Sequence, residues 1–309
     1  MDIVKPIKEI FKAYDIRGKF PDEINRDVAY TIGKAYGTKL LSIGKNKCIV
    51  GYDNRESSIE LSLSLSLGIL STGVDVINLG LVTTPMAIYS KEVLKIPSYV
   101  MVTASHNPKD DNGFKFSFDE SGNVKGDDID KFYDLVVSGN FKEGMGKFSR
   151  YNVEKDYLEL FRRGINLGDK KLKVVIDLAN GTTSCIAREL FEQFDIDLTI
   201  INEESDPSFP NHHPDPCVAA NQKQLQDKVL ELHADLGIGF DGDGDRCGIV
   251  DNLGHIIPTD IYMAIMCKDI ILNNEDKRIL YDVKCSNALK DEIVKWGGIP
   301  ICYRTGASY

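Results

Sequence analysis

The sequence of 309 residues predicts an α/β fold made of consecutive, similar three-layer domains with mixed, mainly parallel sheets. Three observations predict it. Short runs rich in β-branched residues alternate with segments of helical spacing. An apolar run that ends in a polar turn and leads into a helical segment recurs, beginning at Cys48, Val174 and Ile279. Hydrophobic residues make up 42% of the chain and charged residues 27%, a balance typical of well-packed globular domains.

The elements follow one another in the order that a parallel sheet requires. The apolar runs predict strands at 47–53, 75–79, 98–103, 173–177, 198–201, 234–240 and 278–283. The segments of helical spacing predict helices at 22–44, 84–95, 183–194, 219–232, 259–273 and 286–296. Most of these helices lie between two strands, and such alternation is typical of crossover connections between parallel strands.

The segment 58–70 can be interpreted in two ways. It reads SIELSLSLSLGIL, in which apolar and polar residues alternate as they do in a half-buried strand. Its length, and the preceding polar residues from Arg55, which can cap a helix, favour a helix instead. We predict a helix at this position, with a strand as the alternative.

Two turn-rich segments divide the chain. The glycine-rich stretch 142–147 and the turn 251–254 are candidate boundaries, and we predict domains at 1–149, 150–252 and 253–309. The third of these is about half the usual size of a domain. Because the chain ends at Tyr309, soon after an apolar strand, we expect an incomplete third domain.

Charge and cysteine content exclude several kinds of protein. Lys and Arg number 37 and Asp and Glu 47, so the net charge is −10, and an acidic chain without a basic block is a poor binder of nucleic acid. The seven cysteines form no C-x-x-C pair, which indicates buried thiols in a reducing compartment. The N-terminal segment has no apolar core of a signal peptide, and no segment has the roughly 18 apolar residues that span a membrane. We expect a cytoplasmic protein without membrane contact.

The first candidate site is the segment Thr103-Ala-Ser-His-Asn-Pro108. The residue before a proline is forced out of the helical region, so a turn follows the predicted strand. Ser105 is thereby placed at the carboxyl end of a strand, where α/β folds bind their ligands. The G-x-S-x-G pattern of α/β-hydrolases is missing. Ser105 is therefore either a nucleophile of another kind or a polar residue of the turn.

The second candidate site contains three carboxylates. Asp241, Asp243 and Asp245 alternate with glycines, so their side chains can converge on one cation. Oxygen ligands of this type suit Mg²⁺ or Ca²⁺. An EF-hand is excluded, because Arg246 and Asn252 stand where that loop needs glycine and glutamate.

Basic residues accompany these two sites. The candidates are Arg17, Arg55, Lys115, Arg246 and Lys284. Each of them alone is typical of a solvated surface charge. Three of them follow predicted strands, however, and cations at strand ends that face a metal site suit phosphate chemistry.

The segment 207–216 contains four prolines and the pair His212 and His213. Two histidines can bind a metal, but no cysteine or third histidine lies near them in the sequence. We predict a rigid structural loop.

Taken together, the motifs resemble those of the α-D-phosphohexomutase family and, within it, the bacterial phosphomannomutase/phosphoglucomutase group. They occur in the order and with the spacing of the family. The motifs are FKAYDIRG, GYDNRESS, TTP, TASHNP, DNGFK, FPNHHPDP, DGDGDR and YDVKCS.

The resemblance implies a four-domain α/β enzyme whose first three domains are similar. It implies that hexose 1-phosphate and hexose 6-phosphate are interconverted through a hexose 1,6-bisphosphate. Ser105 would carry the phosphoryl group. Mg²⁺ would be bound by that phosphoserine and by the three aspartates of the second site, Asp241, Asp243 and Asp245.

The resemblance also implies roles for the basic residues. Arg17, Lys115 and Arg246 would lie close to the transferring phosphoryl group. Arg17 and Lys284 would bind the substrate. His106 and Lys115 are the two candidates for the group that deprotonates the sugar hydroxyl.

The sequence departs from the family at its end. We expect the family's fourth domain to be absent, and Ala307 stands where the family usually has histidine. We therefore expect greatly reduced activity of this chain alone, and self-association through the open third domain. The alternatives are a phosphoglucosamine mutase, which the opening motif and Thr103 disfavour, and a non-catalytic protein that binds sugar phosphates. The sequence does not distinguish glucose from mannose.

Overall fold

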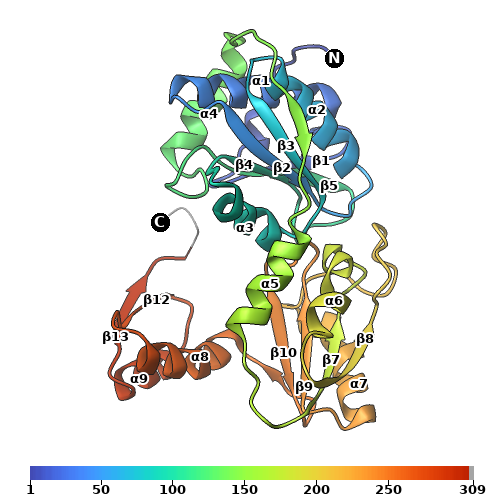
Figure 1. Cartoon of the computed structure of the whole chain (residues 1–309), viewed down its shortest axis with the longest axis vertical. Helices are drawn as coiled ribbons and strands as arrows, with labels where there is room; N and C mark the ends of the chain where they lie inside the picture. Colours follow the sequence, from blue (N-terminus) through green and yellow to red (C-terminus); the bar gives the residue numbers. More distant parts are fainter. Residues whose placement is uncertain (306–309) are drawn as a thin grey trace.

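The computed structural model describes residues 1–305 and contains three α/β units that follow one another along the chain (Figure 1). The first has a six-stranded sheet of order β1-β5-β4-β2-β3-β6, and the second a five-stranded sheet of order β11-β10-β9-β7-β8. The third consists of the pair β12-β13 with two helices. Position 307, where the family usually has histidine, lies outside the described residues. The predicted α/β fold class is confirmed, because helices alternate with mixed sheets in which most strand pairs of the described chain are parallel.

The first unit contains six strands and four α-helices. They are β1 (Ile16–Lys19), α1 (Arg26–Ser42), β2 (Lys47–Tyr52), α2 (Ser58–Leu70), β3 (Asp75–Leu81), α3 (Thr84–Leu94), β4 (Tyr99–Val102), β5 (Asp111–Ser117), α4 (Asp127–Ser138) and β6 (Phe148–Arg150). Strands β2, β3, β4 and β6 are parallel, whereas β5 is antiparallel to both β4 and β1. All four residues of β4 are buried, as expected for a strand that is covered by helices on both faces.

The segment 58–70 is helix α2, as predicted, and its packing explains the unusual alternation. Its serines, such as Ser62, are buried, while Leu63 is exposed. Glycines permit a close approach of α1 and α2, because a Cβ at Gly33 would lie 2.2 Å from the carbonyl oxygen of Leu65. Buried serines, together with leucines that are buried or exposed, therefore produce a strand-like pattern in a helix.

The second and third units follow. They contain α5 (Glu154–Gly164), β7 (Leu172–Asp177), α6 (Ala187–Phe191), β8 (Ile196–Ile201), α7 (Lys223–Leu232), β9 (Leu236–Phe240), β10 (Cys247–Asp251), β11 (Ile256–Ile257), α8 (Thr259–Asn273), β12 (Arg278–Asp282), α9 (Asn287–Lys295) and β13 (Ile299–Tyr303). All seven predicted strands are present. The predicted helix 183–194 is wrong in its first part, which is a 3-10 turn, Thr182–Cys185, that precedes the short α6.

Several elements lie where no strand or helix was predicted. They are β1, β5, β6, β10, β11, α4 and α5. The start of β5 at Asp111, Asn112 and Gly113 has no apolar alternation. A Cβ at Gly113 would lie 2.0 Å from the carbonyl oxygen of Ile16, so there is no room for a side chain. Such tertiary contacts decide the strand, and its local sequence does not.

The first two units share a hydrophobic core. Helix α5 packs against α3 of the first unit and α6 of the second. Val153 and Ile186 are buried in one cluster with Met86 and Met101 of the first unit. Strand β6, which ends at Arg150, still belongs to the first sheet. The two sheets are thus held in a fixed relation, and the aspartate loop of the second (residues 241–246) faces the serine loop of the first (residues 103–110).

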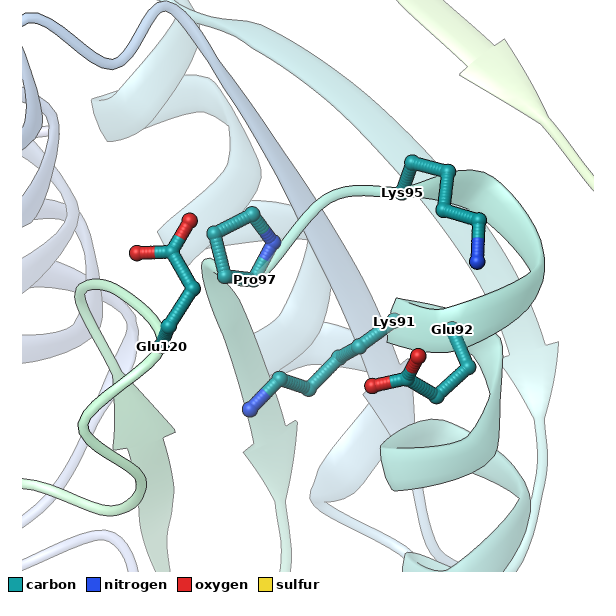
Figure 2. A pocket seen from close by; sticks show the side chains of 5 residues that line it. All are labelled: Lys91, Glu92, Lys95, Pro97 and Glu120. Atoms are coloured by element: carbon teal, nitrogen blue, oxygen red, sulfur yellow. The ribbon is translucent and has the colours of Figure 1, made fainter.

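A hollow on the first unit lies away from both loops (Figure 2). It is lined by Lys91, Glu92 and Lys95 of α3 and its end, by Pro97 and by Glu120. Pro97 precedes β4, whereas Ser105 follows it, so the hollow lies at the opposite end of the strand. Its two lysines and two glutamates give no net charge for binding an anion.

Within the described part of the chain, no helix is both long and apolar enough to cross a bilayer.

Candidate active site

The three predicted aspartates lie on the loop that joins β9 to β10. Asp241 and Asp243 are buried, and the side chain of Asp245 is 30% exposed. One oxygen from each lies within 4.8 Å of the others. Burial, and then repulsion from Asp243 and Asp245, raises the pKa of Asp241 well above its usual range. The loop thus concentrates negative charge that a bound cation would neutralise.

The surroundings of Asp243 fit a metal ion. Its Oδ2 accepts hydrogen bonds from Thr84 Oγ1 (2.6 Å) and Lys115 Nζ (2.6 Å). Its Oδ1 is buried without a hydrogen-bond partner, and a buried unpaired carboxylate oxygen is costly. Burial would raise the pKa of Asp243, but Lys115 outweighs it and lowers the pKa to about 2, so the group is an anion. A hard cation would satisfy the unpaired oxygen.

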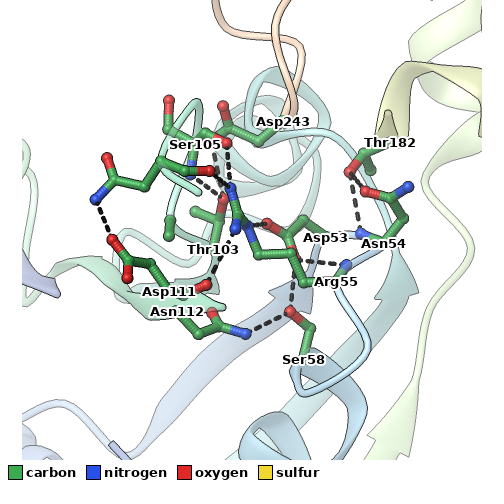
Figure 3. Close-up of polar contacts among 12 residues, drawn as sticks. Asp53, Asn54, Arg55, Ser58, Thr103, Ser105, Asp111, Asn112, Thr182 and Asp243 are labelled. Carbon is green, nitrogen blue, oxygen red and sulfur yellow. Dashed lines mark hydrogen bonds and ion pairs between the residues drawn. The ribbon is translucent and has the colours of Figure 1, made fainter. Parts of the chain in front are cut away.

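Ser105 lies on the turn after β4, directly opposite the aspartate loop (Figure 3). It is fully buried, and its Oγ donates a hydrogen bond of 3.0 Å to Asp241 Oδ2. Its backbone has a φ of +55°, a left-handed conformation that costs a non-glycine residue about 1–3 kcal/mol. A strained, buried serine beside carboxylates is a feature of a functional site, and the surrounding structure has to maintain it.

Two glycines allow the loops to meet. A Cβ at Gly242 would lie 2.6 Å from the carbonyl oxygen of Ser105. Gly244 has a φ of +74°, which glycine adopts without strain. The backbone amide of Thr182 donates to the carbonyl of Gly242 (2.9 Å), and the amide of Thr84 donates to the carbonyl of Asp243 (2.9 Å). Both units therefore hold the aspartate loop through its backbone.

Lys115 and His106 border the serine and the aspartates. Lys115 Nζ lies 2.6 Å from Asp243 Oδ2 and 2.7 Å from Asp245 Oδ2. Burial would lower the pKa of Lys115, but these two carboxylates hold it above its usual range. His106 Nδ1 lies 3.4 Å from Ser105 Oγ, and burial, with a smaller contribution from Arg246, lowers the pKa of His106. In this arrangement the lysine is a cation and the histidine is a neutral ring near neutral pH.

The predicted arginines also lie at this site. Arg17 Nη1 donates to the carbonyl of Ala104 (3.2 Å) and to Asn107 Oδ1 (3.0 Å), and Arg17 pairs with Asp15 at 2.8 Å. Arg246 follows the aspartates, and its backbone amide donates to Asp241 Oδ1 (3.0 Å).

Lys284 lies elsewhere. It is on the third unit and lines a separate pocket with Asp260 and Tyr281. The structure therefore brings Ser105, His106, Lys115, Arg17, Arg246 and the three aspartates into one cluster, and it gives Lys284 no contact with that cluster.

Arg55 corrects the sequence interpretation. It was expected to be a solvated surface charge, but it is one of the largest fully buried side chains of the described chain. Its guanidinium donates to backbone carbonyls of the serine loop. The local sequence gave no sign of this burial, because the groups that cover Arg55 come from a distant loop. Thr84 also belongs to the site, because its hydroxyl donates to Asp243. The sequence identified it only as part of the TTP motif and gave it no role.

The pair His212 and His213 does not join the cluster of Asp241, Asp243 and Asp245. His212 Nε2 lies 2.9 Å from Asp177 Oδ2, and its Nδ1 lies 3.0 Å from the carbonyl oxygen of His213. These contacts fasten the proline-rich loop to the end of β7. The structural role of this loop stays a prediction, which these contacts favour.

Comparison with known proteins places these elements in one family. Residues 8–143 match the model of phosphoglucomutase/phosphomannomutase alpha/beta/alpha domain I, and residues 155–254 match that of domain II. The chain belongs to the phosphoglucomutase/phosphomannomutase family. The resemblance inferred from the motifs is therefore confirmed.

Individual relatives agree with this assignment. A phosphomannomutase/phosphoglucomutase of Pseudomonas syringae pv. tomato is 38% identical over 299 residues, which are 97% of this chain and 64% of the relative. A phosphoglucomutase of Neisseria meningitidis serogroup B is 33% identical, over 98% of this chain and 66% of the relative. The crystal structure of a family protein from Burkholderia thailandensis is 35% identical, with a TM-score of 0.93 over 98% of this chain and 68% of that one. The chain thus spans about two thirds of the length of these relatives.

Proposed function

We propose that this chain contains the phosphoryl-transfer centre of a phosphohexomutase, which interconverts hexose 1-phosphate and hexose 6-phosphate. The observation that carries the proposal is the buried contact of Ser105 Oγ with Asp241, beside the pair of Lys115 and Asp243. Phosphoryl transfer depends on positioning and on charge stabilisation more than on covalent activation, and this cluster supplies both. The names of the relatives include both mannose and glucose enzymes, so the sugar is mannose, glucose or both.

Ser105 carries the phosphoryl group in this proposal. In one half-reaction the Oγ–P bond of phosphoserine breaks, a new O–P bond forms at the sugar hydroxyl, and a base takes the hydroxyl proton and delivers it to the departing Ser105 Oγ. The product is a hexose 1,6-bisphosphate, which returns its other phosphoryl group to Ser105 Oγ. The cations of Arg17, Lys115 and Arg246 stabilise the charge on the transferring group.

His106 is the better placed of the two candidate bases. Its Nδ1 lies 3.4 Å from Ser105 Oγ, at the position where the phosphoryl group is exchanged. Lys115 already donates to two carboxylates and faces them with its ammonium group. We assign proton transfer to His106 and charge stabilisation to Lys115.

The ion proposed for the site is Mg²⁺. Asp241, Asp243 and Asp245 would hold it together with an oxygen of the phosphorylated Ser105. The unpaired Asp243 Oδ1 and the all-oxygen donor set favour a hard cation. When bound, Mg²⁺ neutralises charge on the phosphoryl group. Lys284, on the third unit, would bind the substrate at a distance from this centre.

The experiment is a coupled mutase assay with Mg²⁺, a catalytic amount of hexose 1,6-bisphosphate and either glucose 1-phosphate, mannose 1-phosphate or glucosamine 1-phosphate. Turnover that Ser105→Ala abolishes supports the proposal, and the preferred sugar follows directly. Binding of sugar phosphate without any phosphate on Ser105 would instead support a non-catalytic binding protein.

We also propose that the chain self-associates through its third unit. One face of the sheet β12-β13 packs on α8 and α9, whereas the other exposes Leu280 (64%) and its neighbour Ile301 (39%). Helix α8 is apolar on several faces and buries only Ala264, Cys267 and Ile271. Such open apolar surface is typical of an interface, and a second copy of the chain is the occupant that we propose.

A cytoplasmic location is part of the same proposal. All seven cysteines are free in the described structure, which suits a reducing compartment. The partners are small sugar phosphates, and the charge of −10 disfavours nucleic acid.

A further inference from the structure

Arg55 directs both terminal nitrogens of its guanidinium at one loop, residues 105–111. Its Nη1 donates to the carbonyls of Pro108 (2.6 Å) and Asp111 (3.0 Å). Its Nη2 donates to the carbonyls of Ser105 (2.7 Å) and Asn107 (2.7 Å). Its Nε lies 3.2 Å from Asp53 Oδ2. Four of the five N–H groups of the guanidinium thus donate to carbonyls of this loop, whereas the Nε group is ion-paired with Asp53 without a hydrogen bond.

The loop that Arg55 holds is the one that carries the candidate nucleophile. Four carbonyls between Ser105 and Asp111 point at one buried cation, and without it they would repel one another in a site with little water. The φ of +55° at Ser105 is maintained against its strain by these contacts. The carbonyl of Ser105 lies between the guanidinium on one side and the backbone of Gly242 on the other.

The residue before Arg55 reaches the second unit. Asn54 Nδ2 donates to the carbonyl of Asn180 (2.8 Å) and to Ser205 Oγ (3.0 Å), and the amide of Asn54 donates to Thr182 Oγ1 (3.1 Å). Thr182 in turn holds the carbonyl of Gly242 (2.9 Å). Figure 3 shows this turn between the serine loop and Thr182. One short turn therefore contacts both halves of the site.

We propose that Arg55 is a positioning residue for phosphoryl transfer. It touches neither the proposed substrate nor the aspartates, and it acts by fixing the backbone of residues 105–111 so that Ser105 Oγ faces the aspartate loop. The proposal rests on the proposed role of Ser105 as the phosphoryl carrier. Lysine cannot replace arginine in this role, because its ammonium offers three donors on a single point and lacks the planar fork.

The test compares the wild type with Arg55→Lys and Arg55→Gln. The matched control is Arg188→Lys, which alters an exposed arginine paired with glutamates. Phosphate-free protein is mixed with Mg²⁺ and increasing glucose 1,6-bisphosphate, and phosphate on Ser105 is followed by mass spectrometry. Melting temperature and hydrogen exchange of the peptide that contains residues 103–112 are measured on the same samples.

We expect Arg55→Lys to fold, to exchange faster in residues 103–112 than the wild type, and to be phosphorylated about 100-fold more slowly at saturation, as a displacement of about 1 Å would cause. The bisphosphate concentration at half-saturation should change by less than about threefold, because uniform binding is retained. Arg188→Lys should match the wild type in every measurement.

A maximal rate equal to that of the wild type, or unchanged exchange in residues 103–112, would overturn the proposal. If both Arg55 variants fail to fold, hydrogen exchange of residues 103–112 in the wild type tests the proposal instead. Exchange at the rate of a free peptide would show that Arg55 does not hold this loop in place, and would overturn the proposal. If the wild type takes up no phosphate while residues 103–112 are strongly protected from exchange, the proposed function is wrong. Arg55 then still holds the loop in place, but not for phosphoryl transfer.

Discussion

Gly242→Ala separates the two halves of the site by a distance that the structure defines. The new Cβ would lie 2.6 Å from the carbonyl oxygen of Ser105, and ordinary contact begins at 3.4 Å, so the loops must separate by about 0.8 Å (3.4 − 2.6). Neither side has a flexible side chain that can move aside, because both groups are backbone. Added to the 3.0 Å between Ser105 Oγ and Asp241 Oδ2, this shift breaks their hydrogen bond.

The magnitude follows from the same geometry. Overpacking a tight site costs about 1–3 kcal/mol of the free energy of unfolding. A misplacement near 1 Å lowers the rate of a positioned reaction by about 100-fold. We therefore expect a lower melting temperature and phosphorylation of Ser105 by glucose 1,6-bisphosphate that is slower by about two orders of magnitude.

The assay compares Gly242→Ala with Gly239→Ala. Gly239 lies on β9 just before the aspartate loop, and the nearest atom to its added Cβ is a leucine side-chain carbon at 3.4 Å, an ordinary contact. Gly239→Ala should keep the wild-type rate. Equal rates of Ser105 phosphorylation in the two variants would refute the claim that the separation of the loops controls the chemistry.

Three further predictions concern charge and surface. Burial would lower the pKa of His212, but its contacts with Asp177 and with a backbone carbonyl raise it above the ordinary value of 6.5. The contact between His212 and Asp177 therefore stabilises the folded protein fully below pH 6.5. This stabilisation is lost as the pH rises through the raised pKa of His212 in the folded protein. His212→Gln should remove this part of the pH dependence of the melting temperature. Lys115→Met leaves Asp243 buried without its cation, which should destabilise the protein by about 3–5 kcal/mol, measured by denaturant unfolding, and abolish phosphorylation. Leu280→Lys places a charge on the exposed face of β12 and should lower the average mass in light scattering.

Each of these three has a matched control. His255→Gln removes an exposed histidine and is the control for the loss of a histidine side chain. Lys45→Met breaks an exposed ion pair and should cost little. Leu63→Lys adds a charge to α2 of the first unit and should leave the average mass unchanged. A variant that behaves like its control would contradict the corresponding prediction.

The sequence located the candidate residues better than it located the contacts that hold them in place. Ser105 and the aspartates were identifiable because each follows an apolar strand directly, and the ends of parallel strands converge in space. The contact of Ser105 with Asp241 itself joins residues 136 positions apart, and no local pattern specifies it.

Arg55 illustrates what a local pattern cannot show. An arginine in a polar turn is usually exposed, and here it is buried only because four carbonyls of a loop some 50 residues later surround it. Strand β5 was missed for a related reason, since its partners β1 and β4 determine it. The length of α2 predicted a helix although the alternation of its residues suggested a strand. The serines that caused this alternation are buried in the structure.

The central claim is that Ser105 accepts a phosphoryl group at this cluster. The most direct measurement is peptide mass spectrometry of phosphate-free protein after mixing with Mg²⁺ and glucose 1,6-bisphosphate, with Ser105→Ala in parallel. The account predicts one phosphoryl group on Ser105 of the wild type and none on the variant. Absence of phosphate from Ser105, or equal phosphorylation of the variant at another residue, would contradict it.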